Sequence, residues 1–402
     1  MNPFKNKRIV LAVSGSIACY KIADLASKLT QAGALVDTIL TKAATQFITP
    51  LTFQSVTGRR AYTDDDLWGS EAHVLHVGLG HEADLLVIAP ATANTMAKLA
   101  HGISDSLLTV TALAATCPVL MVPAMDGGMF THPSTQANVQ TLQERGTIFV
   151  GPEEGHLASG LVAKGRMSEP QTILGQIRYT LSRSGALAGR KVVVTAGGTR
   201  ESLDPVRFLT NHSSGKQGYA LAQAALDAGG EVTLITTVTG LPVPAGATVV
   251  PVDTAISMKD AVLAACTDAD VLMMAAAVGD FRPAEVATHK IKKGDGVPTI
   301  ELARNPDILV EVAQQKTQTG TPNISVGFAA ETQDLVAQAQ SKLERKGLDI
   351  IAANNVASTD AGFAVDTNRI TLLQRGQETE MLPLMSKDEV SAELVRRAIA
   401  ML

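Results

Sequence analysis

The sequence predicts an α/β protein made of two Rossmann-like domains, each with three layers in the order α/β/α. Short β-branched, apolar runs alternate with amphipathic stretches of helical period. Most of these runs are apolar throughout, as in parallel strands that helices cover on both faces. The same pattern starts again after a turn-rich segment at 182–189, in a chain of 402 residues.

The first domain is expected to span residues 1–185 and to be flavodoxin-like. It opens with the apolar run Arg8–Val13, a turn at Ser14-Gly15-Ser16 and a helix whose apolar face runs from Ala18 to Leu29. Gly33 suits the end of that helix, where glycine tolerates a left-handed backbone. Further strands are expected at Leu35–Leu40, Leu85–Pro90, Val119–Pro123 and Thr147–Val150, and a helix at Thr172–Leu181.

The second domain is expected to span residues 186–402 and to be Rossmann-like. A late hairpin is expected from Ile370–Leu373 and Glu380–Leu384, followed by a last helix from Lys387 to the end. The remaining elements are strands at Lys191–Thr195, Glu231–Thr236, Val271–Ala276, Ser325–Ala329 and Asp349–Ala352, and helices at Lys216–Ala228, Ala255–Ala265 and Gln333–Lys346.

Composition and charge exclude several classes of partner. The 34 Lys and Arg residues are outnumbered by 39 Asp and Glu, which gives a formal charge of −5. Net attraction to nucleic acid or to an anionic membrane surface is therefore not expected. No apolar run reaches bilayer length, and Met1–Arg8 lacks the pattern of a signal peptide. Three cysteines without metal or redox spacing fit a reducing compartment, so a cytoplasmic location is expected.

Several motifs in the first half follow strand ends. The junction Ser14-Gly15-Ser16-Ile17 offers free backbone N–H groups to a phosphate at a helix N-terminus. Taken alone, an ordinary tight turn is the better interpretation of it. However, 89–95 and 123–126 also leave strands at a carboxyl edge, where open α/β sheets bind ligands. A glycine-punctuated loop at 155–160 is able to fold over such a site.

These motifs resemble those of the flavin-containing cysteine decarboxylases, over residues 7 to 180. The resemblance implies that FMN oxidises the thiol of phosphopantothenoylcysteine, that the resulting thioaldehyde takes up the electron pair left by CO₂, and that reduction then gives 4′-phosphopantetheine. It also implies an essential histidine before Ala83-Asp84, and His76 fits that spacing better than His73 or His81. The implied FMN contacts are Gly15, Ser16 and Ile17 at the phosphate, and Thr41, Thr92, Ala93, Asn94 and Thr95 along the flavin.

Two positions depart from this family's pattern. Asp126 stands where the family usually has an asparagine that donates a hydrogen bond to the substrate carboxylate. An ionised aspartate cannot donate, unless burial raises its pKa and keeps it protonated. Ser159 stands where the family usually has a cysteine acid, and a hydroxyl is a much poorer acid than a thiol. Both residues are candidates for the catalytic chemistry, and a regulatory or impaired flavin-binding domain is the alternative.

The second half carries a longer series of motifs. Thr195–Glu201 leaves the first strand, and the polar string Asn211–Lys216 opens a helix in a way that suits a phosphorylated ligand. An ordinary Rossmann turn accounts for the glycines there but not for the string. Asp280 follows a later strand, and the basic run Lys290–Lys293 is either a solvated loop or a mobile loop over a triphosphate.

This series, with 304–308 and 327–332, resembles phosphopantothenate–cysteine ligase over residues 188 to 400. By that resemblance Asn211 steadies an activated acyl intermediate, Lys290 binds the triphosphate, and Asp280 meets the nucleotide and its Mg²⁺. The other implied CTP contacts are Met274, Ala275, Ala276, Pro306, Asp307, Ile308, Leu309, Phe328, Lys342 and Lys346.

The two resemblances imply one bifunctional protein of coenzyme A biosynthesis. CTP activates the carboxylate of 4′-phosphopantothenate as an acyl-cytidylate, cysteine displaces CMP, and the product is the substrate of the decarboxylase half. Mg²⁺ and lysines would offset charge on the leaving pyrophosphate. A homo-oligomer is expected. An NAD-dependent dehydrogenase is disfavoured, because neither half contains the GxGxxG fingerprint.

Overall fold

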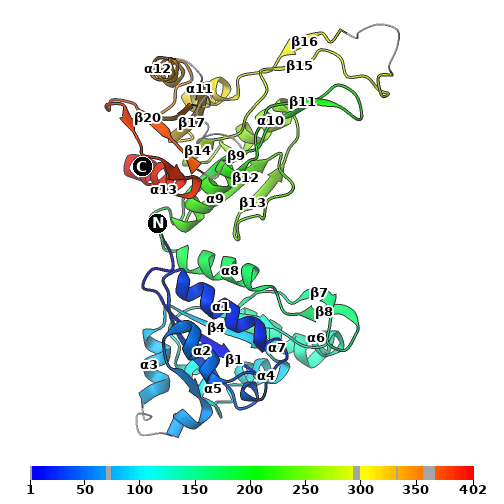
Figure 1. Cartoon of the computed structure of the whole chain (residues 1–402), viewed down its shortest axis with the longest axis vertical. Coiled ribbons are helices and arrows are strands. Elements are labelled where there is room, and N and C mark those ends of the chain that lie inside the picture. Colours follow the sequence, from blue (N-terminus) through cyan, green and yellow to red (C-terminus); the bar gives the residue numbers. More distant parts are fainter. Residues whose placement is uncertain (1, 69–73, 293–298, 332–333, 356–366) are drawn as a thin grey trace. The chain divides into compact units, whose positions relative to one another are not determined.

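The computed structural model describes residues 2–68, 74–292, 299–331, 334–355 and 367–402 (Figure 1). Contacts between residues divide the chain into two compact units, 2–181 and 182–402. Some of the sequence motifs fall outside the described residues, namely His73, Lys293, Gly294, Gly296, Thr332 and Gln333.

The first unit contains a six-stranded parallel sheet with the strand order β3-β2-β1-β4-β5-β6. Its strands are β1 (Arg8–Val13), β2 (Leu35–Leu40), β3 (Ala61–Thr63), β4 (Leu85–Ala91), β5 (Val119–Pro123) and β6 (Ile148–Phe149). Its helices are α1 (Cys19–Gln31), α2 (Pro50–Thr57), α3 (Leu75–Glu82), α4 (Ala93–His101), α5 (Leu107–Ala114), α6 (Gly127–Thr131), α7 (Pro133–Glu144) and α8 (Pro170–Ser182). The hairpin of β7 (Glu153–His156) and β8 (Val162–Arg166) completes the unit.

The predicted fold class is confirmed, but the strand order corrects one detail of it. The order 3-2-1-4-5-6 is that of the doubly wound Rossmann fold, whereas flavodoxin-like sheets run 2-1-3-4-5. Both orders have the same alternation of strands and helices along the chain. The sequence pattern therefore predicted the layers without distinguishing the two orders.

Helices cover both faces of the first sheet, which explains why its strands are apolar throughout. On β1, Ile9 and Leu11 pack on one side with Ile22 of α1 and Ile173 of α8. Val10 and Ala12 point to the other side, where they pack with Met96 of α4 and with Leu107 and Leu108 of α5. Successive strand residues alternate between two separate apolar layers, so every position on β1 beyond Arg8 is buried.

The second unit contains an eight-stranded sheet with the order β13-β12-β9-β14-β17-β18-β20-β21, in which β20 runs antiparallel to both of its neighbours, β18 and β21. Its strands are β9 (Lys191–Ala196), β12 (Glu231–Thr236), β13 (Thr248–Pro251), β14 (Val271–Met274), β17 (Ile324–Glu331), β18 (Ile350–Asn355), β20 (Ile370–Gln374) and β21 (Glu380–Met381). Its helices are α9 (Lys216–Asp227), α10 (Ala255–Ala265), α11 (Ile308–Thr319), α12 (Leu335–Arg345) and α13 (Lys387–Met401). The parallel part repeats the Rossmann order of the first unit.

Three short strand pairs in the second unit had no counterpart in the sequence pattern. They are β10 (Arg200–Ser202) with β11 (Phe208–Thr210), β15 (Phe281–Pro283) with β16 (Leu302–Arg304), and β19 (Thr367–Asn368) with β22 (Met385–Ser386). The first two pairs form arms that extend beyond the sheet (Figure 1). Each strand has two or three residues, too few to show an alternation of apolar and polar positions.

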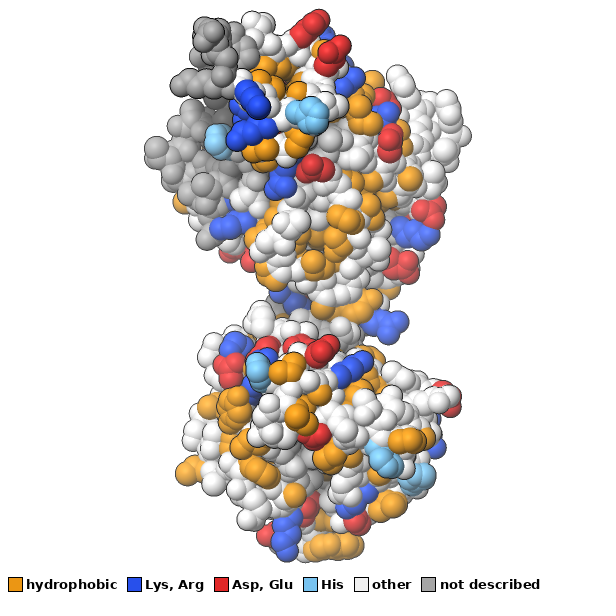
Figure 2. Space-filling view, turned by 90° about the vertical axis from the view of Figure 1, so that its right-hand side faces the viewer, with side chains coloured by type: hydrophobic (Ala, Val, Ile, Leu, Met, Phe, Trp, Pro, Cys, Tyr) orange, Lys and Arg blue, Asp and Glu red, His pale blue; other side chains and the backbone are white. Residues whose placement is uncertain are grey.

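The surface and the cysteines agree with the predicted class. Lys and Arg side chains are scattered among Asp and Glu over the visible face of each unit (Figure 2). Within the described part of the chain, no helix is both long and apolar enough to cross a bilayer. Cys19, Cys117 and Cys266 are free thiols, and burial raises the pKa of Cys266 to about 12.

Candidate active sites

The predicted flavin contacts of the first unit meet at the carboxyl edge of its sheet. Ser14 joins two of the loops, because its hydroxyl donates to Pro90 O (2.7 Å) and accepts from Thr92 N (3.0 Å). The loop after β2 is tied to β1 by a bond from Thr41 N to Val13 O (3.0 Å). Since β1 and β4 lie side by side, this is the switch point at which doubly wound sheets bind ligands.

Two observations indicate that these loops are suited to bind a flavin phosphate. A side chain at Gly15 would place its Cβ 2.5 Å from Ala43 Cβ, so only glycine lets the turn approach the loop after β2. Thr92 caps α4 by accepting from Thr95 N (3.3 Å), and its hydroxyl lies 3.0 Å from that of Thr95. The edge thus gathers the hydroxyls of Ser14, Thr41, Thr92 and Thr95, together with the N–H groups that follow Gly15.

The β7–β8 hairpin folds over the end of β5. Gly165 accepts a backbone hydrogen bond from Met125 N (3.0 Å), and a Cβ on Gly165 would collide with Met125 O. Gly127 is equally close to the hairpin, since its Cβ would lie 2.5 Å from Ala163 Cβ. Two glycines therefore let the hairpin backbone rest directly on the loop that carries Asp126.

The two residues that depart from the family pattern contact each other in this arrangement. Ser159, at the tip of the hairpin, donates from Oγ to Asp126 Oδ2 at 2.6 Å. The other carboxylate oxygen of Asp126 accepts from Gly128 N (3.0 Å). The hydrogen bonds from Ser159 and Gly128 lower the pKa of Asp126. Asp126 is therefore an ionised acceptor near neutral pH, and burial does not keep it protonated.

His76 lies on a different part of the first unit. It belongs to α3, which lies at the left of the first unit in Figure 1, whereas the β7–β8 hairpin lies at the right. Its Nδ1 is buried and has no hydrogen-bond partner among the described residues. The structure therefore does not bring His76 together with Asp126 and Ser159 within one chain.

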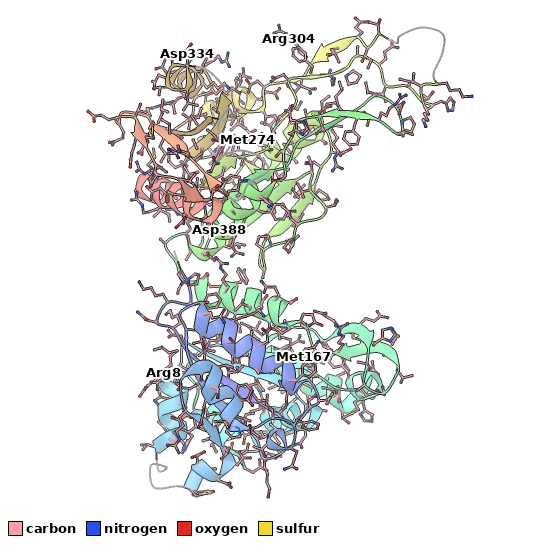
Figure 3. All side chains as sticks on the ribbon, in the orientation of Figure 1. Arg8, Met167, Met274, Arg304, Asp334 and Asp388 are labelled. Atoms are coloured by element: carbon pink, nitrogen blue, oxygen red, sulfur yellow. The ribbon has the colours of Figure 1, made fainter. Side chains whose placement is uncertain are left out.

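The second unit has a cavity of about 980 Å³ at its own switch point, between β9 and β14. Arg304 is contributed by the arm, and Met274 ends β14 inside the unit (Figure 3). The predicted residues that line the cavity are Asn211, Met274, Ala275, Ala276, Asp280, Pro306, Asp307, Ile308, Leu309, Phe328 and Lys346. Residues separated by more than 130 positions in the sequence are thus collected around one space.

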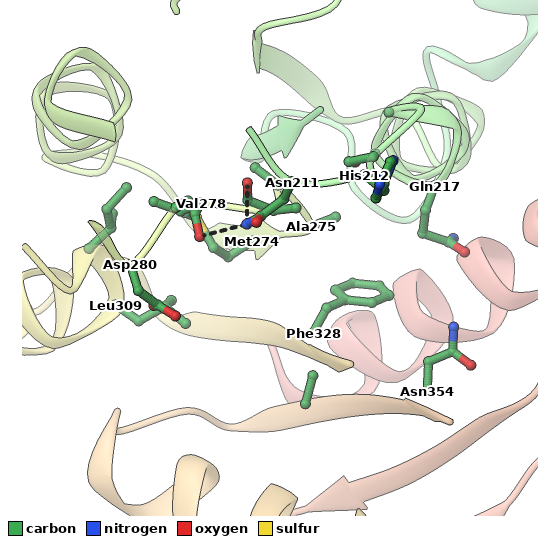
Figure 4. A pocket seen from close by; sticks show the side chains of 18 of the residues that line it. Asn211, His212, Gln217, Met274, Ala275, Val278, Asp280, Leu309, Phe328 and Asn354 are labelled. Atoms are coloured by element: carbon green, nitrogen blue, oxygen red, sulfur yellow. Dashed lines mark hydrogen bonds between the residues drawn. The ribbon is translucent and has the colours of Figure 1, made fainter. Parts of the chain in front are cut away.

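The loops around this cavity are tied together by side-chain amides (Figure 4). Asn211 Nδ2 donates to Val278 O (3.2 Å) and Ala277 O (3.4 Å), and so joins the loop before α9 to the loop after β14. Asn305 Nδ2 donates to Gly279 O (2.8 Å), which holds the backbone beside Asp280. β14 ends at Met274, before the predicted Ala276, because Ala276 N bonds the side chain of Thr195 (3.0 Å) and leaves the ladder.

Cations and a helix N-terminus make the cavity suitable for a phosphorylated ligand. Lys216, Arg304, Lys346 and Lys387 line it, against the carboxylates of Asp280 and Asp307. Lys346 Nζ lies 3.1 Å from Asp307 Oδ2. The 12-residue helix α9 begins at this wall, and a Cβ on Gly218 would lie 2.5 Å from Ala196 Cβ, so glycine lets the helix pack closely against β9.

Two predicted CTP contacts, Lys290 and Lys342, do not line the cavity. Lys290 lies on the loop between β15 and β16, next to residues outside the described range. This loop is held at its base, since Ile291 N donates to Asp204 Oδ2 (3.1 Å) and Arg207 Nη2 donates to Ile291 O (2.8 Å). Lys342 lies on α12, four residues before Lys346.

Sequence reasoning missed several lining residues, namely Gln217, Asn354, Asn368 and Lys387. Asn368 and Lys387 lie at the cavity because Gln217 of α9 donates to Lys387 O (3.3 Å) and accepts from Asn368 Nδ2 (3.4 Å). Asn354, at the end of β18, has a buried Oδ1 with no partner among the described residues. Its place at a carboxyl edge was the one signal that could have indicated it.

The described side chains give only partial support for a bound metal ion. In the described ranges, no three His, Cys, Asp or Glu side chains cluster as metal ligands would. Asp280 is an exposed carboxylate at the cavity wall. One carboxylate completed by substrate phosphates is a common way for proteins to hold Mg²⁺.

A known family model matches each half of the chain. The Flavoprotein family model matches residues 2–182, and the model of the DNA/pantothenate metabolism flavoprotein C-terminal domain matches residues 187–402. The chain is 38% identical to the crystal structure of the C-terminal domain of coenzyme A biosynthesis bifunctional protein CoaBC (TM-score 0.46, 54% of this chain, 98% of that one). It is also 38% identical to a cysteine-to-serine mutant of PPC decarboxylase complexed with pantothenoylaminoethenethiol (TM-score 0.40, 43% and 97%).

The particular family follows from relatives of the same length. The chain is 45% identical to the coenzyme A biosynthesis bifunctional protein CoaBC of Bacillus subtilis, over 98% of this chain and 97% of that protein. It is 43% identical to the CoaBC protein of Vibrio vulnificus, over 99% and 98%. The chain therefore belongs to the CoaBC family, as a bifunctional enzyme with a flavoprotein decarboxylase half and a ligase half.

Proposed function

We propose that the second unit uses CTP to join cysteine to 4′-phosphopantothenate through an acyl-cytidylate. The observation that carries this proposal is the cavity at the β9–β14 switch point, which is lined by the predicted nucleotide contacts other than Lys290 and Lys342, from four separate segments. A carboxylate does not react with an amine near neutral pH, so the site must bind an activating nucleotide and hold three substrates in one place.

Different residues of the cavity would contribute to different parts of this reaction. The N–H groups at the start of α9 and the amines of Lys216 and Lys346 attract phosphates, and Phe328 supplies an apolar face to the base. Asn211 fixes the loops on both sides of the reacting carbonyl. Asp280 would hold Mg²⁺ together with the triphosphate, and the ion would offset charge on the leaving pyrophosphate. Lys290 would contact the triphosphate only when the loop between β15 and β16 closes over the nucleotide.

For the first unit, we propose FMN-dependent decarboxylation of phosphopantothenoylcysteine to 4′-phosphopantetheine. FMN, when bound, supplies the electron sink that a cysteinyl carboxylate otherwise lacks. The Gly15 turn and the hydroxyls of Thr41, Thr92 and Thr95 would hold it, with Ile17, Ala93 and Asn94 beside them. The hairpin carrying Ser159 lies against the loop of Asp126, where it would contact a bound substrate. The alternative is that Asp126 and Ser159 leave a flavin-binding regulatory half that turns over poorly.

Assembly of several copies is part of this proposal. Because His76 lies apart from Asp126 and Ser159 in one chain, a second copy would be needed to bring a histidine to the hairpin, which supports a homo-oligomer. Small-molecule substrates alone, without nucleic acid or membrane, suit the mixed charges of the surface. The three free thiols suit a reducing compartment such as the cytoplasm.

The nucleotide requirement tests the ligase proposal. Full-length protein is incubated with 4′-phosphopantothenate, cysteine and Mg²⁺, with CTP, ATP or no nucleotide, and the products are followed by mass spectrometry. With CTP, we expect the amount of CMP to equal the sum of phosphopantothenoylcysteine and 4′-phosphopantetheine, because each acyl-cytidylate yields one CMP and one acyl-cysteine. Product without a nucleotide, or CDP in place of CMP, would contradict activation through an acyl-cytidylate.

A further inference from the structure

The contact between Asp126 and Ser159 raises the question of how an anionic carboxylate substrate binds beside an anionic side chain. Lysine or arginine ion pairs with Asp126 are absent from the described residues, and its partners are the Ser159 hydroxyl and the Gly128 N–H. The charged and titratable groups on the elements packed against it are His132, Glu153, Glu154, His156, Lys164 and Arg166. Lys164 Nζ lies 5.7 Å from the centre of the Phe130 ring, and Arg166 pairs with Glu169, so both are engaged elsewhere.

Overall decarboxylation consumes one proton. The reaction R–CO₂⁻ + H⁺ → R–H + CO₂ breaks a C–C bond, leaves its electron pair on the substrate carbon and forms a C–H bond there. The electrons that a bound flavin takes up are returned within the cycle, so no other oxidant is needed. The protein must therefore hold one proton near the reacting carbon in each turnover.

We propose that Asp126 takes up this proton when the carboxylate substrate binds and delivers it through the Ser159 hydroxyl. The inference rests on the proposed decarboxylase function. Two carboxylates in one site repel unless they share a proton, so substrate binding favours protonation of Asp126. When CO₂ leaves, the neighbouring charge disappears and Asp126 becomes a good donor. Ser159 Oγ, 2.6 Å away, then gives its own proton to the substrate carbon and receives the one held on Oδ2.

This relay explains why a serine at the hairpin tip is compatible with catalysis. A hydroxyl is a weak acid by itself, but it transfers a proton readily when a carboxylic acid replaces the proton at once. The pKa of Asp126 is low in the free protein because of the same two hydrogen bonds. Asp126 is therefore unprotonated before the substrate binds, and it takes up its proton when the substrate binds. Asp126 and Ser159 thus form one functional unit.

The test measures proton uptake on binding, without turnover. FMN-loaded full-length protein is titrated with 4′-phosphopantothenoylserine, which keeps the carboxylate but has no thiol, in two buffers of different ionisation enthalpy at about pH 7. Calorimetry then gives the number of protons bound with the ligand. We expect wild type to take up about one proton more than Asp126→Asn, because two carboxylates share one proton. The ligase half and the ligand phosphate are the same in both proteins and cancel in the difference.

Equal proton numbers in wild type and Asp126→Asn would overturn the proposal, provided that wild type releases CO₂ from phosphopantothenoylcysteine. Failure to release CO₂ would contradict the proposed function, and the inference with it. The ligand 4′-phosphopantetheine, which lacks the carboxylate, should show no such difference. Ser159→Ala should keep the proton uptake but slow product formation roughly 10²-fold, and Ser159→Cys should restore it, since a thiol is itself an acid. Loss of proton uptake in Ser159→Ala would contradict the separate roles of the two residues.

Discussion

Replacing Asn211 by aspartate is expected to slow ligation about 10²- to 10³-fold while leaving decarboxylation unchanged. The amide of Asn211 donates to Ala277 O and Val278 O, and this is the link between the loop before α9 and the loop after β14. An aspartate has no proton to donate and would face two carbonyl oxygens, so it would turn away and separate the loops. It would also add a negative charge to a cavity that has to hold a triphosphate and a phosphorylated acid.

The measurement is the rate of CMP formation at saturating CTP, with 4′-phosphopantothenate and cysteine varied. Asn323→Asp is a matched control, because it makes the same change at an exposed residue at the amino end of β17, away from the cavity. CO₂ release from phosphopantothenoylcysteine reports that the other half is intact. A ligation rate within threefold of wild type for Asn211→Asp would show that the loops do not depend on this amide.

Replacing Gly15 by alanine is expected to weaken FMN binding roughly ten- to a hundredfold. The added methyl group would lie 2.5 Å from Ala43 Cβ and 2.9 Å from its carbonyl carbon, so either the turn or the loop after β2 has to move. Overpacking of this kind costs about 1–3 kcal/mol. Because a factor of ten corresponds to about 1.4 kcal/mol, the loss appears directly in the dissociation constant.

Flavin fluorescence titration of the apoprotein gives that constant. Gly78→Ala is the matched control, because its new methyl group would have Glu82 Oε1, at 4.0 Å, as its nearest neighbour and would sit within the helix α3. We expect the control to bind FMN as wild type does, and ligation to continue in both variants. Unchanged FMN affinity in Gly15→Ala would mean that the flavin phosphate is not bound at this turn.

The order of elements could be predicted from the sequence because each strand is buried on both faces and each helix has one apolar side. Arg8–Val13 and Glu231–Thr236 occupy the predicted ranges for this reason. The strand order could not be predicted, because it depends on which side of the sheet each connection passes. The local pattern of apolar residues is the same in the Rossmann and the flavodoxin-like orders. The arms were missed since their strands are too short to have a period.

The candidate sites were predictable where a motif follows a strand directly. Asn211, Asp280 and the segment 306–309 follow strand ends or open helices, and all of them line the cavity. Asn368 and Lys387 were not predictable, because they lie on β19 and at the start of α13 and reach the cavity through their contacts with Gln217 of α9. Likewise, Asp126 and Ser159 each departed from the family pattern, but their contact depends on a hairpin that folds back across 33 residues.

In the proposed function, both halves act in sequence on one substrate. Its most direct test is to incubate FMN-loaded full-length protein with 4′-phosphopantothenate, cysteine, CTP and Mg²⁺ and to follow the products by mass spectrometry. We expect phosphopantothenoylcysteine to rise and fall while 4′-phosphopantetheine accumulates, with one CMP and one CO₂ for each molecule formed. Accumulation that stops at phosphopantothenoylcysteine would contradict it, and would leave a ligase joined to a flavoprotein half that does not decarboxylate.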